Sequence, residues 1–308
     1  MSGIERAARR LVPYLHGEVG SVPVAPGGYR GMVEDLARRV LGVCDAVLSV
    51  EQLALGAIGG GSTDVVDLDS SLDVWLARVE AYPGLAVVVG TACEQWRAGL
   101  LELLGRWRAD AERVCAALSR GAAPGRLVHV VGGAGDRHHG GRSVALLRFE
   151  SGLRVVYKPK DLTVAAATMD LFAVLNAGSD VLLPTRVVIC ADGYGWEEHV
   201  EAAPVATPGA FETYYRRLGA LTRVFQHLGA RDLWADNLVA VGDEPHFVDL
   251  ECVLFAPLDV VDDGAWSLTL RAEQTVVRTA IPLAASTPGF GLYAPDVGCL
   301  SHAGDPRS

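Results

Sequence analysis

The chain carries the stretch Arg231-Asp232-Leu233-Trp234-Ala235-Asp236-Asn237 and, after two short apolar runs, Val248-Asp249-Leu250-Glu251. An aspartate thus stands five residues before an asparagine, and two further acids alternate with apolar residues. An aspartate can accept the proton of a hydroxyl group, and oxygen ligands from carboxylates and carboxamides suit Mg²⁺. The two later acids would share one face of an extended segment. We therefore predict a proton acceptor, Asp232, beside a magnesium site formed by Asn237, Asp249 and Glu251.

Upstream of this stretch, the sequence predicts a β-hairpin that ends in a lysine. Apolar runs over 144–149 and 153–157 flank Ser151-Gly152, a two-residue turn signal. Lys158 follows the second run, where its charge can bind nucleotide phosphates. Taken alone, a lysine at a strand end is usually a solvated surface residue. Asp232 taken alone is equally compatible with capping a turn.

The order of the predicted elements favours a kinase-like fold. A short strand over 127–131 leads into a glycine-rich loop, and the lysine hairpin follows. Next come a helix over 163–176, strands over 185–191 and 194–200, a helix over 211–228 and the Asp232 loop. Kinases arrange their phosphate-binding loop, lysine, catalytic aspartate and metal ligands in the same order. We predict an α+β, two-lobed kinase-like fold over 122–308, with the first lobe at about 122–200 and the second at about 201–308.

Residues 1–121 are predicted to form an N-terminal helical region without recognisable chemistry. Apolar residues keep a helical period over 32–48 and, after Pro83-Gly84, over 85–118. The first 30 residues carry little period, and residues 56–71 are typical of a loop. This region is therefore expected to contribute structure rather than a site.

The glycine-rich loop over 132–142 contains more than glycine. Asp136, His138, His139 and Arg142 add an acid, two bases and a guanidinium that can bind phosphate. Adjacent histidines on an extended chain face opposite ways, which disfavours joint binding of a metal. The loop predicts acid–base and phosphate chemistry, the alternative being a polar surface turn.

Composition and charge exclude several classes of protein. Half of the 308 residues are hydrophobic, which excludes wholesale disorder. The net charge of −10 argues against a nucleic-acid or anionic-membrane partner. Six scattered cysteines without a CxxC pair indicate buried free thiols. No signal-peptide or membrane-spanning run is present, so we expect a soluble, cytoplasmic protein.

Several short segments form an ordered set. Residues 135–144 are GDRHHGGRSV, 156–160 are VYKPK, 194–198 are YGWEE and 278–282 are RTAIP. With the opening stretch, they resemble the GDxHxxGRxV, VYKPR, YGW-Q/E-E, DxHxxN, IDLE and RTxLLP boxes of one family. This is the dehydratase domain of class II lanthipeptide synthetases (LanM type), and the resemblance runs from about residue 80 to the end.

The resemblance implies a core like that of lipid kinases and a two-step reaction. The family phosphorylates Ser and Thr of a precursor peptide, which has a leader and a core, using ATP and Mg²⁺. It then eliminates phosphate, leaving dehydroalanine and dehydrobutyrine. Lys158 would contact the ATP phosphates, Asp232 would be the base, and Asn237, Asp249 and Glu251 would hold the metal.

The same resemblance assigns a second group of residues to elimination. Asp136 and His138 would belong to the activation and elimination machinery, and Thr279 to elimination. Removing an α-proton while phosphate leaves requires converging bases and phosphate binders. The 132–142 loop, which includes Arg142, supplies such groups, and phosphorylation alone does not need them.

The sequence departs from the family pattern at three points. Trp234 stands where the family has histidine, Lys160 where arginine is usual, and the chain ends at Ser308, before the family's zinc-containing cyclase. We therefore expect a truncated or split family member, for which a separate synthetase or cyclase chain is a further partner. Two alternatives stay open: a peptide or small-molecule kinase without elimination, and an inactive module that binds the precursor peptide.

Overall fold

The computed structural model describes residues 22–57, 82–133 and 140–254, and for residues 45–57 the backbone alone. Contacts divide the chain into two compact units, Met1–Lys160 and Asp161–Ser308. Both units mix helices and strands, which confirms the α+β class, whereas the two-lobed kinase-like arrangement stays a prediction. The division falls after the lysine hairpin, because the N-terminal helices pack with the first strands.

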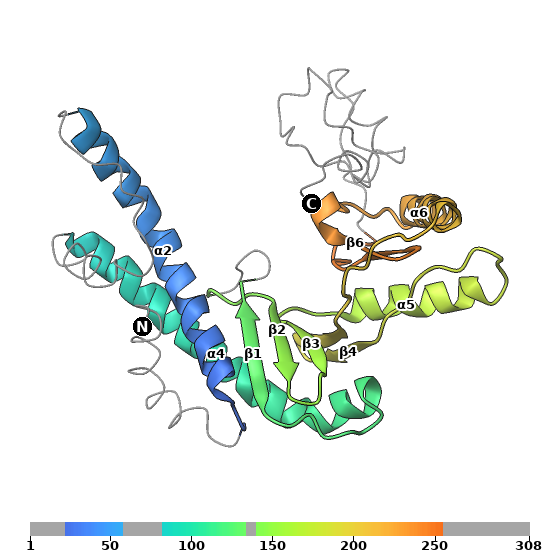
Figure 1. Ribbon diagram of the computed structural model, residues 1–308, viewed down its shortest axis with the longest axis horizontal. Coiled ribbons are helices and arrows are strands. Elements are labelled where there is room, and N and C mark those ends of the chain that lie inside the picture. The colour runs from blue at the N-terminus through green and yellow to red at the C-terminus, as the bar shows by residue number, and fades with distance from the viewer. Residues whose placement is uncertain (1–21, 58–81, 134–139, 255–308) are drawn as a thin grey trace. The chain divides into compact units, whose positions relative to one another are not determined.

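The first unit packs two long helices against antiparallel strands (Figure 1). Its elements are α2 (Pro26–Ala57), α4 (Pro83–Leu118), β1 (Leu127–Gly132), β2 (Ala145–Phe149) and β3 (Arg154–Lys158). Each helix has proline at its first position, where the missing N–H would have no partner within the helix. The hairpin turns at Ser151-Gly152 as predicted, with Gly152 at a φ of 87°. The helix expected over 32–48 is confirmed, but it begins earlier, at Pro26, and so includes Gly27, Gly28 and Gly31.

Helix α4 covers one face of these strands. Alternate residues of β2 and β3 are buried on that face, and Phe149 stacks on Trp107 of α4 with ring centroids 4.4 Å apart. The pairing of β1 with β2 shifts register between Leu127 and His129. Because such a bulge adds one residue, Leu127 and Val130 are both buried although they lie three positions apart.

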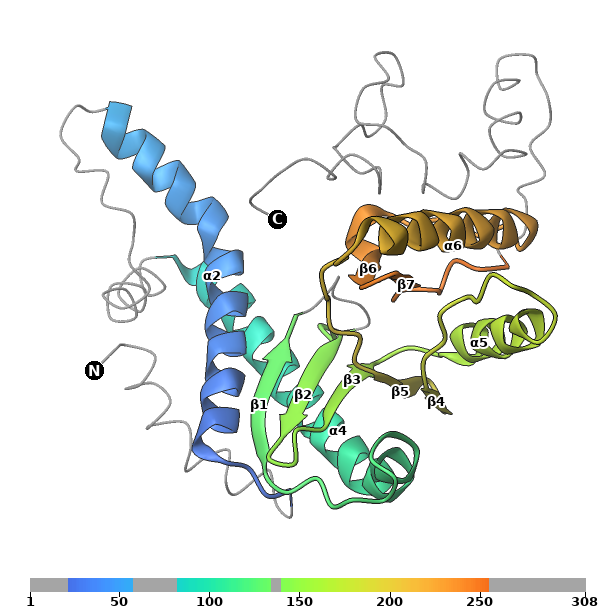
Figure 2. The ribbon, with the colours of Figure 1, turned by 45° about the vertical axis from the view of Figure 1, so that its right-hand side comes forward.

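Helix α2 lies beside β1, and glycine makes this approach possible (Figure 2). A Cβ atom on Gly27 would lie 2.7 Å from the carbonyl oxygen of Val128, and one on Gly28 would lie 2.6 Å from that of Leu127. A Cβ atom on Gly31 would clash with the carbonyl oxygen of Val130. The absence of side chains at these positions therefore allows the helix to contact the strand backbone directly.

The second unit packs two helices with two hairpins. Its elements are α5 (Thr163–Asn176), β4 (Val188–Ala191), β5 (Tyr194–Glu198), α6 (Pro208–His227), the 3-10 turn η1 (Ala235–Asn237), β6 (Leu238–Val241) and β7 (Glu244–Phe247). The hairpins turn at Gly193 and Gly242, whose φ angles are 73° and 58°. Thr207 caps α6 by accepting a hydrogen bond from the backbone N–H of Ala210 at 3.2 Å.

One apolar core joins the helices of the second unit to its last hairpin. Phe225 of α6 packs edge-on against Phe172 of α5 and Phe247 of β7, with centroids 5.9 and 5.3 Å apart. Leu233 and Leu250, which lie in the predicted site stretches, are 0% and 2% exposed in the same core. The core therefore fixes the backbone on which the candidate site is built.

Two predictions from composition can be compared with this structure. Free thiols are confirmed for the cysteines in the described part of the chain, of which Cys44 and Cys115 are buried. Within the same part, no helix has the length and apolar character needed to cross a membrane.

The glycine contact between α2 and β1 predicts opposite effects for two similar substitutions. Gly31→Ala should lower the free energy of unfolding by about 1–3 kcal/mol, because its methyl group would push α2 away from Val130. Gly42→Ala, on the same helix with open space around it, should raise that free energy by about 0.5–1 kcal/mol. Urea unfolding of both variants tests this, and equal effects would contradict the close contact.

Candidate functional site

The loop that carries Asp232 is shaped by one buried residue, Leu233. After Gly229, Asp232 takes a left-handed backbone conformation with φ of 60°, which is uncommon for a residue with a side chain. Leu233 is fully buried, so it anchors the loop in the core while Asp232 stays exposed. The anchored turn therefore presents the carboxylate of Asp232 on the surface of the unit.

Backbone hydrogen bonds tie this loop to the segment after β7. Arg231 donates its N–H to the carbonyl of Cys252 at 3.0 Å, and Val248 donates to the carbonyl of Asn237 at 2.9 Å. These bonds place two segments of the chain next to each other. As a result, potential ligand atoms of Asp232, Glu251 and Cys252 lie within 4.8 Å of one another.

The structure thus brings together part of the predicted site. Asp232 and Glu251 fall in this cluster, and Cys252 joins them although the sequence gave no reason to expect it. Asp249 is half-buried and is not part of the cluster. Glu251 begins a turn, so the alternation that was expected to place both acids on one face stops at Leu250.

Asn237 supports the Asp232 loop directly. Its side-chain Nδ2 donates to the backbone carbonyl of Asp232 at 3.0 Å, and its own N–H donates to the carbonyl of Trp234 at 3.0 Å. With Nδ2 used in this way, the carboxamide presents Oδ1 as its remaining polar atom. The predicted metal ligand therefore also holds the turn in shape.

Trp234 contacts the predicted catalytic acid. Its indole Nε1–H donates a hydrogen bond to Oδ1 of Asp232. An indole can donate one hydrogen bond and accepts none. The tryptophan in the place of the family's histidine therefore orients the Asp232 carboxylate but cannot take a proton from it.

A buried ion pair contacts the end of β7, just before Asp249. Nε of Arg186 lies 3.1 Å from Oε2 of Glu197, and both side chains are 3% exposed. The same guanidinium donates to the carbonyls of Phe247 at 2.7 Å and Val248 at 3.5 Å. Arg186 thus fixes the backbone immediately before Asp249.

The YGWEE segment contains Glu197, whereas no motif indicated Arg186. Arg186 is a charged residue inside the largely apolar run over 185–191. Such a residue indicates a buried charge that needs a partner. The neighbouring Gly195 is required for close packing, because a Cβ atom there would lie 2.7 Å from the carbonyl oxygen of Ile189. Trp196 is fully buried, so much of the YGWEE segment has a structural role.

His246 lies in β7, shortly before Asp249 in the sequence. Burial lowers its pKa, an effect partly opposed by a contact of 3.2 Å between its Nε2 and Oε2 of Glu244. The imidazole is therefore neutral at neutral pH.

In the first unit, Lys158 ends β3 and is 6% exposed. Its neighbour Tyr157 points toward α4, where its hydroxyl accepts a hydrogen bond from Arg106. Because successive side chains of a strand face opposite ways, Lys158 points to the face of the strands away from α4. Lys158 is therefore not part of the charged groups on α4.

Arg142 lies on the α4 side of the strands. Its Nε donates to Oε2 of Glu102 at 2.6 Å, and Glu102 also pairs with Arg106. The hydrogen bond that Arg142 donates to Glu102 raises the pKa of Arg142, which keeps the guanidinium charged. The structure therefore places Arg142 in a network with α4, and its catalytic role stays a prediction.

The remaining predicted residues lie outside the described part of the chain. These are Asp136 and His138 in the glycine-rich loop and Thr279 near the end of the chain.

Comparison with known proteins places the chain in a family. Residues 82–307 match the family described as "Domain of unknown function (DUF4135)", and the chain belongs to this family. It is also 28% identical over 137 residues to the lacticin 481/lactococcin biosynthesis protein LcnDR2 of Lactococcus lactis subsp. lactis. That match covers 42% of this chain and 15% of the relative, so the chain corresponds to a small part of that protein. The matches confirm the predicted relationship to class II lanthipeptide synthetases.

The buried pair predicts a large and specific loss of stability. Arg186→Met should lower the free energy of unfolding by about 3–5 kcal/mol, because the Glu197 carboxylate stays buried after its main cation is removed. Adding Glu197→Leu should recover part of this loss, since no charge then remains buried at the site. Urea unfolding followed by circular dichroism measures both effects.

A matched control is available on α6. Arg216 and Glu212 form an ion pair at 2.8 Å with side chains 63% and 73% exposed. Arg216→Met should change the free energy of unfolding by no more than about 0.5 kcal/mol. Equal losses for Arg186→Met and Arg216→Met would show that the buried pair has no special role.

Proposed function

We propose that this chain modifies a lanthipeptide precursor by phosphorylating Ser and Thr residues with ATP and Mg²⁺ and then eliminating phosphate. The observation that carries the proposal is the loop of Asp232, which brings an exposed carboxylate next to Glu251 and rests on Asn237. The ordered sequence boxes and the match to a lacticin biosynthesis protein support the same reaction.

In the first step, a peptide hydroxyl oxygen attacks the γ-phosphorus of ATP. The bond from that phosphorus to the β,γ-bridging oxygen breaks, and ADP leaves. Asp232 accepts the hydroxyl proton, and the hydrogen bond from Trp234 holds its carboxylate in one orientation. Lys158 is assigned to the phosphates of ATP, because an ammonium group offsets their negative charge.

The donor set fits a hard divalent cation. Asp232, Asn237, Asp249 and Glu251 offer oxygen atoms, which are the ligands that Mg²⁺ prefers, whereas the thiol of Cys252 is a poor ligand for it. We assign the cation to Asn237, Asp249 and Glu251 on the motif resemblance; of these three, Glu251 is the one that lies in the cluster with Asp232. Mg²⁺ held there would supply positive charge to offset that of the phosphate oxygens.

In the second step, a base removes the α-proton of the phosphorylated residue. The Cα–Cβ double bond forms as the bond from Cβ to the phosphate oxygen breaks, and inorganic phosphate leaves. Asp136, His138, Arg142 and Thr279 are assigned to this step. These residues supply the acid–base and phosphate-binding groups that it requires.

The proposal predicts the products of a direct assay. The chain incubated with MgATP and a lanthipeptide precursor peptide should give peptides that have lost water, with phosphopeptide as an intermediate. Lys158→Ala and Asp249→Asn should each lower the rate by at least about 100-fold, because both remove charge that stabilises the transferring phosphoryl group. Mass spectrometry measures both products.

The products separate the candidate activities. Phosphopeptide without loss of water would support a kinase that lacks elimination. The absence of both products, together with a melting temperature that MgATP does not raise, would refute the proposal and favour a binding module.

Trp234 provides a second test of the first step. Trp234→Phe keeps an aromatic ring but removes the donor to Asp232, and should lower kcat about 10–100-fold with little change in KM. Trp234→His restores a donor and introduces a group that titrates near neutral pH, so activity should return with an added limb in the pH–rate profile. Full activity of Trp234→Phe would show that the hydrogen bond has no catalytic importance.

A further inference from the structure

Both ends of the glycine-rich loop are attached to helix α2, which lies before the residues 82–307 that match the family. We infer that Asp35 and Arg39 of α2 are positioning residues that fix the two ends of this loop. What the loop does in the reaction rests on the proposed function, whereas the attachment itself is a property of the described structure.

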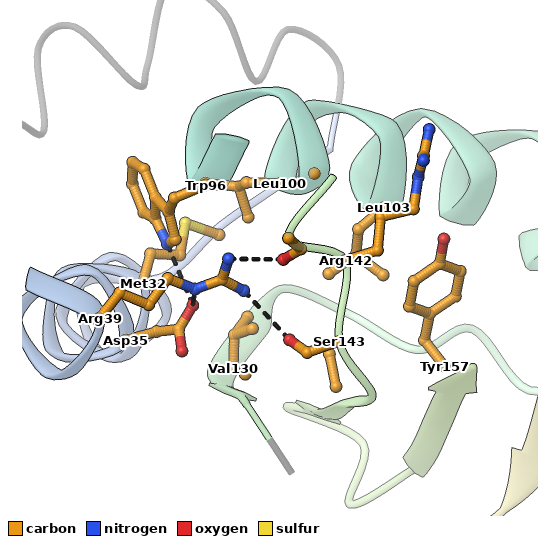
Figure 3. Close-up of a pocket in the computed structure, with 14 residues that line it drawn as sticks. Met32, Asp35, Arg39, Trp96, Leu100, Leu103, Val130, Arg142, Ser143 and Tyr157 are labelled. Atoms are coloured by element: carbon orange, nitrogen blue, oxygen red, sulfur yellow. Dashed lines mark hydrogen bonds and ion pairs between the residues drawn. The ribbon is translucent and has the colours of Figure 1, made fainter. Parts of the chain in front are cut away.

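The attachment begins with the way α2 lies against β1. Glycines at positions 27, 28 and 31 allow the first turns of the helix to contact the strand backbone. One to two turns further along, Asp35 and Arg39 therefore reach the point where β1 ends and the loop begins. There they line a pocket together with Trp96 of α4 and Ser143 (Figure 3).

Arg39 holds the far end of the loop through its guanidinium fork. Nη1 donates to the carbonyl of Gly141 at 2.7 Å, and Nη2 donates to Oγ of Ser143 at 3.0 Å. The side chain is 9% exposed, so these bonds are shielded from water. Two acceptors at a fixed spacing require a planar fork, which a lysine ammonium group lacks.

Ser143 connects the far end of the loop to its near end. Its Oγ also accepts a hydrogen bond from the backbone N–H of Gly133 at 3.1 Å. Residues on both sides of the segment 134–139 are thus joined through one hydroxyl group, and Arg39 holds that hydroxyl in place. The spacing between the two ends of the loop is set by this bridge.

Asp35 holds Arg39 in place, and through it the hydroxyl of Ser143. Its carboxylate accepts a hydrogen bond from Nε1 of Trp96 at 3.1 Å and lies 3.3 Å from Nε of Arg39. A Cβ atom on Gly132 would lie 2.7 Å from this carboxylate, so the strand end is packed directly on it. Asp35 thereby orients Arg39 and limits the position of the loop's first residues.

This arrangement has a consequence for elimination that phosphorylation does not share. The residues assigned to the second step, Asp136 and His138, belong to the segment whose ends are held in this way. A small displacement of such groups costs much of the rate, because bases and phosphate binders act only at a defined distance from the reacting atoms. Loss of the bridge should therefore slow elimination more than phosphorylation.

Amide hydrogen exchange of the intact chain tests the attachment without any substrate. Ser143→Ala removes the acceptor for the N–H of Gly133, and exchange at Gly133 should become about tenfold faster. Arg39→Met should have the same effect, and Arg39→Lys should restore only part of the protection. Arg30→Met, which breaks an ion pair with Glu34 at an arginine 58% exposed on the same helix, is the control and should leave Gly133 unchanged.

These exchange rates test whether α2 holds the loop ends, even if one of the variants does not fold. Unchanged exchange at Gly133 in Ser143→Ala would overturn it, even if Arg39→Met fails to fold. Faster exchange in Arg30→Met as well would also overturn it, because the effect would then reflect general loosening of α2.

The ratio of the two peptide products tests the role of the positioning residues. With MgATP and the precursor peptide, Ser143→Ala and Arg39→Met should raise the ratio of phosphopeptide to dehydrated peptide at least about tenfold over wild type. A general structural defect would lower both steps and leave this ratio unchanged, which would refute the role in elimination. If the wild-type chain forms neither product, the proposed function fails, and hydrogen exchange alone decides the attachment.

Discussion

The guanidinium of Arg186 is buried against the carboxylate of Glu197 and donates to the last carbonyls before Asp249. This interaction connects the hairpin of β4 and β5 to the segment that carries the candidate metal ligands. Replacement of such a pair by apolar residues is often tolerated, so burial of charge alone does not explain what the pair contributes. Its hydrogen bonds to carbonyl groups have defined directions, which apolar contacts lack. We therefore interpret Arg186 as the residue that sets where the chain leaves β7.

Arg39 uses the same chemistry in the first unit. It too is buried beside a carboxylate, that of Asp35, and it too donates to a backbone carbonyl, that of Gly141 at the end of the glycine-rich loop. In both cases the acid satisfies part of the guanidinium charge, and the remaining N–H groups hold the main chain. Each unit thus fixes a loop by means of a buried arginine and its carboxylate partner.

The sequence predicted the local elements well and the distant contacts poorly. The helix over 163–176, the hairpin at Gly152 and the strand pair that meets at Gly193 follow from periodicity and turn chemistry, which act within a few residues. The hydrogen bond from Arg186 to Phe247 joins residues 61 positions apart, and that from Arg39 to Gly141 joins residues 102 apart. No periodicity within one sequence indicates such pairs. The turn at Glu251 was missed because alternation of acids and apolar residues over four positions also suits a strand.

Trp234 shows how a departure from a motif can keep part of its chemistry. An imidazole in this position can donate to the catalytic acid, but it can also accept a proton and carry charge, so its effect changes near neutral pH. The indole N–H donates to Asp232 and does not titrate near neutral pH. The substitution therefore retains the orientation of the carboxylate and removes the partner that could share its proton. In the mechanism we propose, the indole cannot relay the hydroxyl proton, which therefore passes from Asp232 to solvent or to the phosphates.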